Sequence, residues 1–101
     1  MIARLWRATA TTPGAAAYAA HFDETVLPSL RALNGFHIAY LLNRDTDHGT
    51  VEIEVISFWD SLDSIRAFTG DRELDTAVVE PEAQAVLTSF DETVRHFDVV
   101  L

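Results

Sequence analysis

Residues 51–68 read VEIEVISFWDSLDSIRAF, and this stretch decides the fold. Apolar and polar residues alternate from Val51 to Trp59, and a period of two residues predicts a strand with one buried face. Asp60 or Ser61 then supplies the N-cap of a short helix. The apolar stripe of this helix consists of Leu62, Ile65 and Phe68. This stretch therefore predicts a strand that leads directly into a helix, and the other elements are assigned relative to these two.

The flanking segments predict the other elements. Strands are predicted over residues 2–10, 36–43 and 93–100. An amphipathic helix of about five turns separates the first two strands, and Pro28 is expected to kink it or to split off its last turn. Another short helix begins at Pro81. Residues 71–80 stay ambiguous, because their apolar positions suit either one helical turn or the lining of a loop, and the segment could form a lid over a cavity or fill it.

The order of elements is strand, helix, strand, strand, helices, strand. This is the split β-α-β pattern of an α+β, ferredoxin-like fold, with a four-stranded antiparallel sheet and helices on one face. We expect residues 1–101 to form a single domain. The second strand should direct Phe36, Ile38, Tyr40 and Leu42 to one side. Because no helix remains to cover the second face of the sheet, a homodimer through this open sheet face is predicted.

Composition excludes several classes of function. The chain has 7 basic and 16 acidic residues, a net charge of −9, which argues against nucleic acids and anionic membrane surfaces as partners. The absence of cysteine excludes disulfides, thiolate metal sites and cysteine nucleophiles, and fits a cytoplasmic protein. All basic residues are arginine, so Schiff-base chemistry on lysine is excluded. Without a run of about 18 apolar residues, no membrane span is expected.

Four segments carry a family resemblance. They are MIARLWR (1–7), LNGF (33–36), SFWDSLDSIRAF (57–68) and VRHFDVV (94–100). Together they resemble the antibiotic biosynthesis monooxygenase superfamily, whose members are dimeric α+β barrels. The resemblance implies a pocket bordered by Trp59. It implies the fold more strongly than the activity, because the superfamily includes quinone-forming oxygenases, haem-degrading enzymes and members with no known reaction.

The strongest candidates for chemistry lie on the first and last strands. His96 titrates near neutral pH and shares a face with Asp98, which is expected to orient its ring or raise its pKa. The alternative is a half-buried histidine at a dimer interface. Arg4 and Trp6 share a face of the first strand, where an arginine beside an aromatic floor suits an anionic or enolate oxygen.

Other side chains are candidates for lining a pocket. The predicted substrate-binding residues are Trp6, Tyr40, Ser57 and His37. Tyr40 and Ser57 are expected on one layer of the sheet, His37 at a rim; a hydroxyl at the dimer face is the alternative for Tyr40. Trp59 is either catalytic or plain packing, and His21 and His48 are expected to face solvent. No histidine pair has metal-ligand spacing and no glycine-rich phosphate loop is present, so neither a metal site nor a nucleotide cofactor is predicted.

These features favour a cofactor-independent monooxygenase that acts on an aromatic or polyketide-like small molecule. His96 would be the base and Arg4 the anion stabiliser, with aromatic walls that include Trp59. One alternative is a haem-binding and haem-degrading enzyme with His96 as axial ligand. The resemblance implies for that branch an asparagine on the first strand and a histidine on the following helix, and residues 2–10 and 61–80 contain neither. The other alternative is a non-catalytic dimeric barrel, which a purely apolar cavity would favour.

Overall fold

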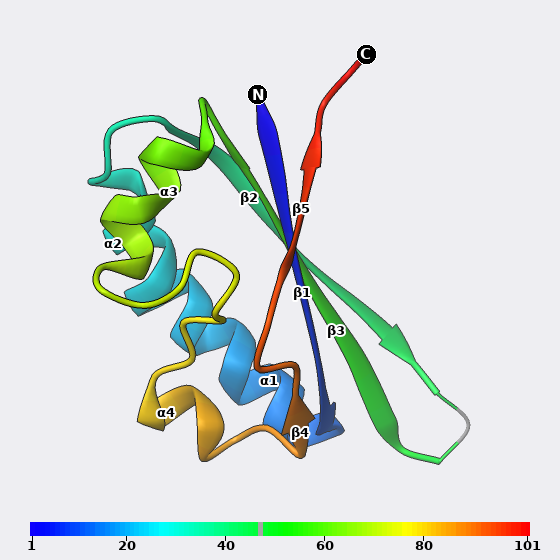
Figure 1. Cartoon of the computed structure of the whole chain (residues 1–101). Helices are drawn as coiled ribbons and strands as arrows, with labels where there is room; N and C mark the ends of the chain where they lie inside the picture. Colours follow the sequence, from blue (N-terminus) through cyan, green and yellow to red (C-terminus); the bar gives the residue numbers. More distant parts are fainter. Residues whose placement is uncertain (47) are drawn as a thin grey trace.

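An antiparallel sheet with helices on one face forms the framework of the molecule (Figure 1). The computed structural model describes residues 1–46 and 48–101. The strands are β1 (Ile2–Thr11), β2 (Phe36–Asp45), β3 (Thr50–Trp59), β4 (Ser89–Phe90) and β5 (Arg95–Asp98). The helices are α1 (Thr12–His21), η1 (Phe22–Val26), α2 (Leu27–Arg31), α3 (Leu62–Thr69) and α4 (Pro81–Gln84). Among these described residues, no helix is long and apolar enough to cross a bilayer.

The sheet has the strand order β2-β3-β1-β4, and β5 also pairs with β1. This order and the position of the helices confirm the predicted ferredoxin-like α+β fold. The fourth position differs in detail, because two short strands share it: β4 pairs with Ala8 and Thr9, and β5 with residues 2–5. The strand predicted over residues 93–100 is therefore shorter than expected. A strand of two residues such as β4 has no period that a sequence can display.

The long helix changes its hydrogen bonding midway. It begins as α1, continues through the π-helical turn η1 and ends as α2, in which Pro28 occupies the first turn. The N–H of Leu27 donates to the carbonyl of Phe22, five residues earlier. Pro28 has no N–H to donate to the carbonyl four residues before it, so the regular ladder is interrupted there. Pro28 was expected to kink the helix or to split off its last turn. The structure shows instead a wider, π-helical turn directly before the proline.

Two apolar clusters fill the space between the sheet and the helices. The larger one packs Trp6, Ile53 and other residues of β1 and β3 against Tyr18 and Phe22 of the long helix. The smaller one is formed by Leu30, Trp59 and Ile65. Ser61 rather than Asp60 caps α3, since its side chain accepts from the N–H of Ser64. The predicted transition from strand to helix thus contributes Trp59 and Ile65 to the second cluster.

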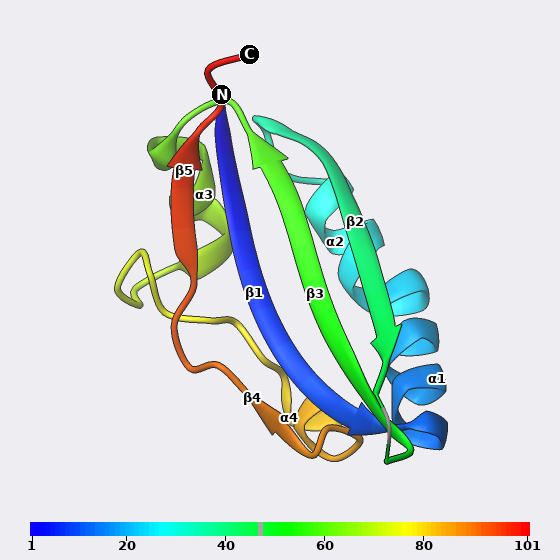
Figure 2. The ribbon, with the colours of Figure 1, turned by 90° about the vertical axis from the view of Figure 1, so that its right-hand side faces the viewer.

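The opposite face of the sheet, called the open face below, carries no helix (Figure 2). A register shift between Phe36 and Ile38 changes which side chains of β2 reach it. Phe36 turns inward, with its ring centroid 5.2 Å from that of Trp59, whereas Ile38 and Tyr40 are exposed on the open face. The expectation that Phe36 shares a face with Ile38, Tyr40 and Leu42 is wrong, because a bulge inserts one residue into the two-residue period.

Gly35 precedes β2 in a conformation that other residues rarely adopt. Its φ is +86°, and a Cβ atom there would lie 2.4 Å from Cβ of Ser64. We expect Gly35→Ala to lower the free energy of unfolding by about 2–4 kcal/mol, from backbone strain and the clash together. Gly49 (φ +70°) has no atom within 4 Å of such a Cβ, so Gly49→Ala should lose only about 1–2 kcal/mol. Urea denaturation measures both losses, and equal losses would contradict the close packing on Ser64.

Candidate active site

Three polar side chains form a row across the helix-facing side of the sheet. Arg4 on β1 is the register partner of Ser57 on β3 and of His96 on β5. Residues directly opposed in antiparallel strands point their side chains to the same face, about 5 Å apart. Arg4 is 4% exposed and Ser57 5%. The next inward side chains along β1, Trp6 and Ala8, belong to the apolar core, so the row is a polar band at its edge.

The guanidinium of Arg4 is the centre of a hydrogen-bond network. Its Nη1 donates to the carbonyl of Leu74 (2.8 Å), and its Nη2 to that of Thr76 (2.9 Å). The same Nη1 lies 2.9 Å from Nε2 of His96. Because a guanidinium can only donate, Nε2 of His96 accepts and its ring proton resides on Nδ1. Residues 71–80, called the strap below, are therefore fastened to β1 by a buried cation.

This cation has no carboxylate at salt-bridge distance within the part of the chain that the structure describes. Burial lowers the pKa of Arg4 to about 10, and the more distant Asp75 opposes that shift. Burial, and then the charge of Arg4, lower the pKa of His96, again against Asp75. The expected rise of the His96 pKa is thus wrong in direction, because burial and the charge of Arg4 outweigh Asp75, and Asp98 is not among the causes of the shift. His96 is neutral at pH 7.

A small cavity of about 50 Å³ adjoins Arg4 between the sheet and the helices. Its wall includes Arg4, Trp6, Tyr18, Phe22, Ser57 and Val78. The wall is predominantly apolar and aromatic, with a cation at one side. Small-molecule sites usually measure at least about 300 Å³, so in this state the cavity has room only for a few waters or a diatomic gas. Val78 belongs to the strap, which shows that the strap forms part of the wall.

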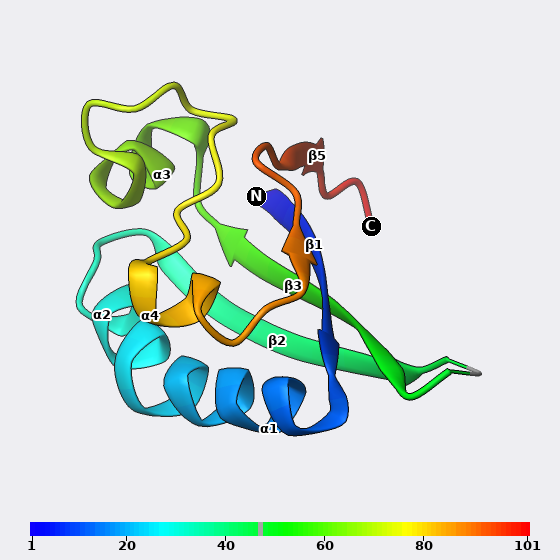
Figure 3. The ribbon, with the colours of Figure 1, turned by 90° about the horizontal axis from the view of Figure 1, so that it is seen from below.

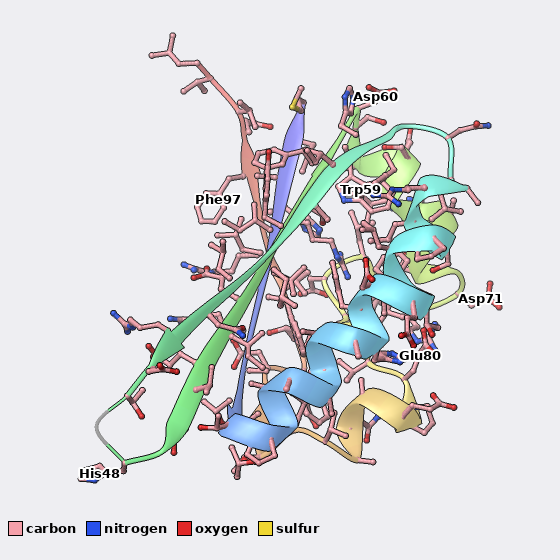
Figure 4. All side chains as sticks on the ribbon, turned by 180° about the vertical axis from the view of Figure 1, so that it is seen from behind. His48, Trp59, Asp60, Asp71, Glu80 and Phe97 are labelled. Carbon is pink, nitrogen blue, oxygen red and sulfur yellow. The ribbon has the colours of Figure 1, made fainter. Side chains whose placement is uncertain are left out.

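Trp59 is on the helix side of the sheet but is not one of the residues that line the cavity (Figure 4). It is completely buried, and its Nε1 donates to Oγ of Ser57 (2.9 Å). With that oxygen accepting, the hydroxyl proton of Ser57 is available to a group in the cavity. The Nε1 of Trp6 is already bonded to the carbonyl of Asp91 (2.8 Å), so Trp6 offers only its ring. Trp59 therefore positions Ser57, and Trp6 forms the wall.

Several predicted site residues lie elsewhere. Tyr40 does not share a layer with Ser57, because the register partner of Ser57 is Ala39 and Tyr40 points to the open face. His37 is exposed and pairs with Asp60, away from the cavity. His48 is exposed at the tip of the β2–β3 hairpin, as predicted (Figure 4). His21 is only partly exposed, and its Nε2 is buried without a hydrogen-bond partner in the described part of the chain.

Tyr18 and Phe22 line the cavity, although their place in the sequence marks them only as part of the apolar stripe of the long helix. Their spacing of four residues is the same for a packed core and for a cavity wall, so periodicity does not separate the two. Tyr18 carries the one available signal, a hydroxyl within an apolar stripe, which calls for a polar neighbour. Burial, followed by the charge of Glu80, raises the pKa of this hydroxyl far above its ordinary value. Tyr18 therefore stays protonated at neutral pH.

Comparison with known proteins relates this architecture to solved structures. No family model and no curated protein matches the sequence. The structure of SnoaB, a cofactor-independent oxygenase from Streptomyces nogalater, matches 99% of this chain and 94% of its own, with 17% identity and a TM-score of 0.63. A proposed antibiotic biosynthesis monooxygenase from Bacillus cereus matches over 99% and 95%, with 14% identity and a TM-score of 0.65.

A third structure, a proposed antibiotic biosynthesis monooxygenase from Deinococcus radiodurans, covers 98% of this chain and 92% of its own. Its identity is 12% and its TM-score 0.60. The chain has the fold of the antibiotic biosynthesis monooxygenases. This fold supports different reactions, so the residues of the polar row and the cavity decide which reaction suits this chain.

The pKa of His96 makes stability depend on pH in a defined direction. The folded-state pKa lies below the ordinary value of 6.5, so unfolding takes up a proton between these two values. The contribution of neutral His96 is complete above about pH 6.5 and is lost as the pH falls towards the folded-state pKa.

We therefore expect the unfolding free energy of the wild type, minus that of His96→Gln, to decrease from about pH 7.5 to pH 5.5. Glutamine keeps an acceptor for Arg4 but does not titrate. Urea denaturation at several pH values measures this difference, and His48→Gln in the exposed hairpin is the control that should keep the wild-type pH dependence. A difference that is flat or rises on acidification would contradict the assignment of Nε2 as acceptor.

Proposed function

We propose that the protein is a cofactor-independent monooxygenase whose substrate, an aromatic or polyketide-like small molecule, reacts as an anion. The observation that carries this proposal is the buried guanidinium of Arg4, which adjoins an aromatic cavity and has no carboxylate at salt-bridge distance among the described residues. A buried charge with no carboxylate in direct contact destabilises a protein, and an anionic ligand relieves that cost. A phenolate or enolate fits both the cation and the apolar walls. The fold that the chain shares with SnoaB, a cofactor-independent oxygenase, supports the same reaction class.

The residues of the row have distinct roles in this proposal. His96, which is neutral at pH 7, takes the proton of a phenol or enol once the substrate replaces the present contact with Arg4. Arg4 and the hydroxyl of Ser57 stabilise the oxyanion. Trp59 acts through Ser57, whose oxygen it holds. Trp6 binds the ring.

The electron-rich anion then reduces dioxygen directly. A CH₂ group of the substrate and one O₂ give a carbonyl and one water, so that one oxygen atom enters the substrate and the other leaves with both hydrogens. Substrate electrons supply the whole reduction, and the protein contributes binding and proton transfer. The aromatic wall suits binding of the substrate ring, and the buried donors suit stabilisation of its anion.

The two alternatives have less support from the geometry. A haem role for His96 requires its Nε2 to leave the contact with Arg4 and would place the iron beside a buried cation, so the residues present do not fit this group. A plain ligand-binding barrel would suit a purely apolar cavity, whereas Arg4 and Ser57 both line this one. The oxygenase is therefore the function we put forward.

Oxygen uptake with a panel of phenolic and enolic polycyclic compounds tests the proposal. We expect turnover by the wild type, with kcat/KM lowered at least about 100-fold in Arg4→Gln and in His96→Gln, because each removes charge stabilisation or the proton acceptor. Arg66→Gln on the exposed surface of α3 is the control and should keep full activity. Wild-type rates in both site variants would make the role assignment wrong, and tight binding of these compounds without oxygen uptake would favour the binding barrel.

We also propose that two copies associate through the open face. Its exposed apolar side chains include Ile38 (45% exposed), Tyr40 (50%) and Phe97 (48%), and Figure 4 shows Phe97 pointing away from the helices. Side chains of this size rarely stay exposed together on a monomer. The face is continuous across β2, β3, β1 and β5, which suits packing against a second sheet.

Sedimentation velocity at micromolar concentration should therefore give a dimer. Tyr40→Glu places a charge in the centre of the apolar contact and should shift the protein towards monomer. Leu62→Glu is the matched control, because Leu62 is similarly exposed (43%) but lies on α3, on the helix side. A monomeric wild type, or an equal effect of both variants, would overturn the proposed interface.

A further inference from the structure

The strap connects α3 with α4 and passes beside the segment that leads into β5 (Figure 3). Two backbone bonds fasten it to that segment: the N–H of Ala77 donates to Glu92 (2.9 Å), and the N–H of Val94 donates to Asp75 (2.8 Å). The guanidinium of Arg4 adds two bonds, to the carbonyls of Leu74 and Thr76, and Nε2 of Gln84 donates to the carbonyl of Val79 (2.9 Å). Apart from one isolated bridge to Thr93, the strap belongs to no sheet or helix.

The strap is the wall of the cavity that can move most easily. Most other wall residues belong to β1, β3 and the long helix, which are joined by the strand ladder and the larger apolar cluster. Phe68 of α3 and Val94, which precedes β5, complete the wall, and each packs against an apolar cluster. The strap contributes Val78 to the cavity and has no such ladder. An apolar cavity that admits a benzene ring measures about 150 Å³, roughly three times the present volume of about 50 Å³. An aromatic ligand therefore needs a wall to move.

Arg4 connects this movement with the charge of the ligand. Three of its five N–H groups are already engaged, by Leu74, Thr76 and His96. The two carbonyls are bound by Nη1 and Nη2. These are the two nitrogens with which a guanidinium binds an oxyanion in the bidentate manner. A charged acceptor is stronger than a neutral carbonyl, so an anion in the cavity competes with the strap for the same donors.

We propose that residues 71–80 form a lid over the cavity, that Arg4 is its latch, and that an aromatic anion opens it by taking the latch. Arg4 is a positioning residue for the strap in the closed state and a ligand-binding residue in the open state. The existence of the lid follows from the contacts of Arg4 and the strap. Its response to an anion rests on the proposed function.

Amide hydrogen exchange tests the lid without any turnover. The bonded amides of Ala77 and Val94 should exchange at least about 100-fold faster than that of Ile53 at the centre of β3, because the lid opens without unfolding the sheet. Arg4→Lys keeps the charge but cannot hold both carbonyls, and should speed the exchange of Ala77 and Val94 about tenfold. The bonds to Arg4 are absent in the open lid and in the unfolded chain alike, so the exchange of Ile53 should rise by no more than the same factor, whereas a loss of stability that does not involve the strap would speed Ile53 alone. Strap amides that exchange at the rate of β3 would overturn the lid.

A reversible lock provides a second variant. Thr76 and Thr93 oppose each other between the two bonded pairs, the non-hydrogen-bonded arrangement in which Cα atoms lie about 4.5 Å apart, within disulfide range. Oxidised Thr76→Cys/Thr93→Cys should lose the fast exchange, and dithiothreitol should restore it. The wild type, which has no cysteine, is the control for both reagents. Fast exchange that persists in the oxidised protein would overturn the lid.

The anion response is tested with 2-naphthoate against neutral 2-naphthalenemethanol. The carboxylate should raise the exchange of Ala77 and Val94 relative to Ile53, and the alcohol should not. No change, or slower exchange with 2-naphthoate, would overturn the competition for Arg4. A failure of the proposed oxygenase would appear instead as absent oxygen uptake, with the exchange of the strap unaffected.

Discussion

The guanidinium of Arg4 is the interaction on which the helix side of the sheet depends. It is 4% exposed and joins three parts of the chain: β1, β5 through His96, and the strap through two carbonyls. Lysine at this position would reach fewer of these acceptors, because its donors leave a single nitrogen, whereas arginine spreads five over a plane. The same side chain fixes the tautomer of His96 and lines the cavity. The position of the strap and the chemistry of the row therefore have one cause.

The charge distribution indicates how a substrate would reach this cation. The whole chain carries a net charge of −9, which repels anions at a distance, while the cavity itself is cationic. In the oxygenase that we propose, this combination favours a substrate that approaches as a neutral phenol or enol and loses its proton inside. A neutral histidine beside the cation suits that order of events. The acidic surface and the buried arginine are then complementary features of one site.

The sequence predicted the layers of the molecule better than it predicted the contacts within the site. The alternation from Val51 to Trp59 and the cap at Ser61 determine a strand and a helix from local spacing, and both are present. The position of Tyr40 depended on the register of β2, which a bulge next to His37 shifts by one residue. The acceptors of Arg4 on the strap are backbone carbonyls. Every residue has a backbone carbonyl, so no pattern of side chains in the sequence indicates which carbonyls Arg4 binds.

One feature of the site did have a signal in the sequence, namely Pro28. Its missing N–H interrupts the helical ladder, and the π-helical turn η1 stands directly before it. The residues at the two ends of this turn, Phe22 and Val26, both line the cavity. A π-helical turn inserts one residue and displaces the following side chains around the axis, which leaves an imperfectly packed wall. The proline that is expected to bend the helix therefore lies directly after the turn whose two end residues line the cavity.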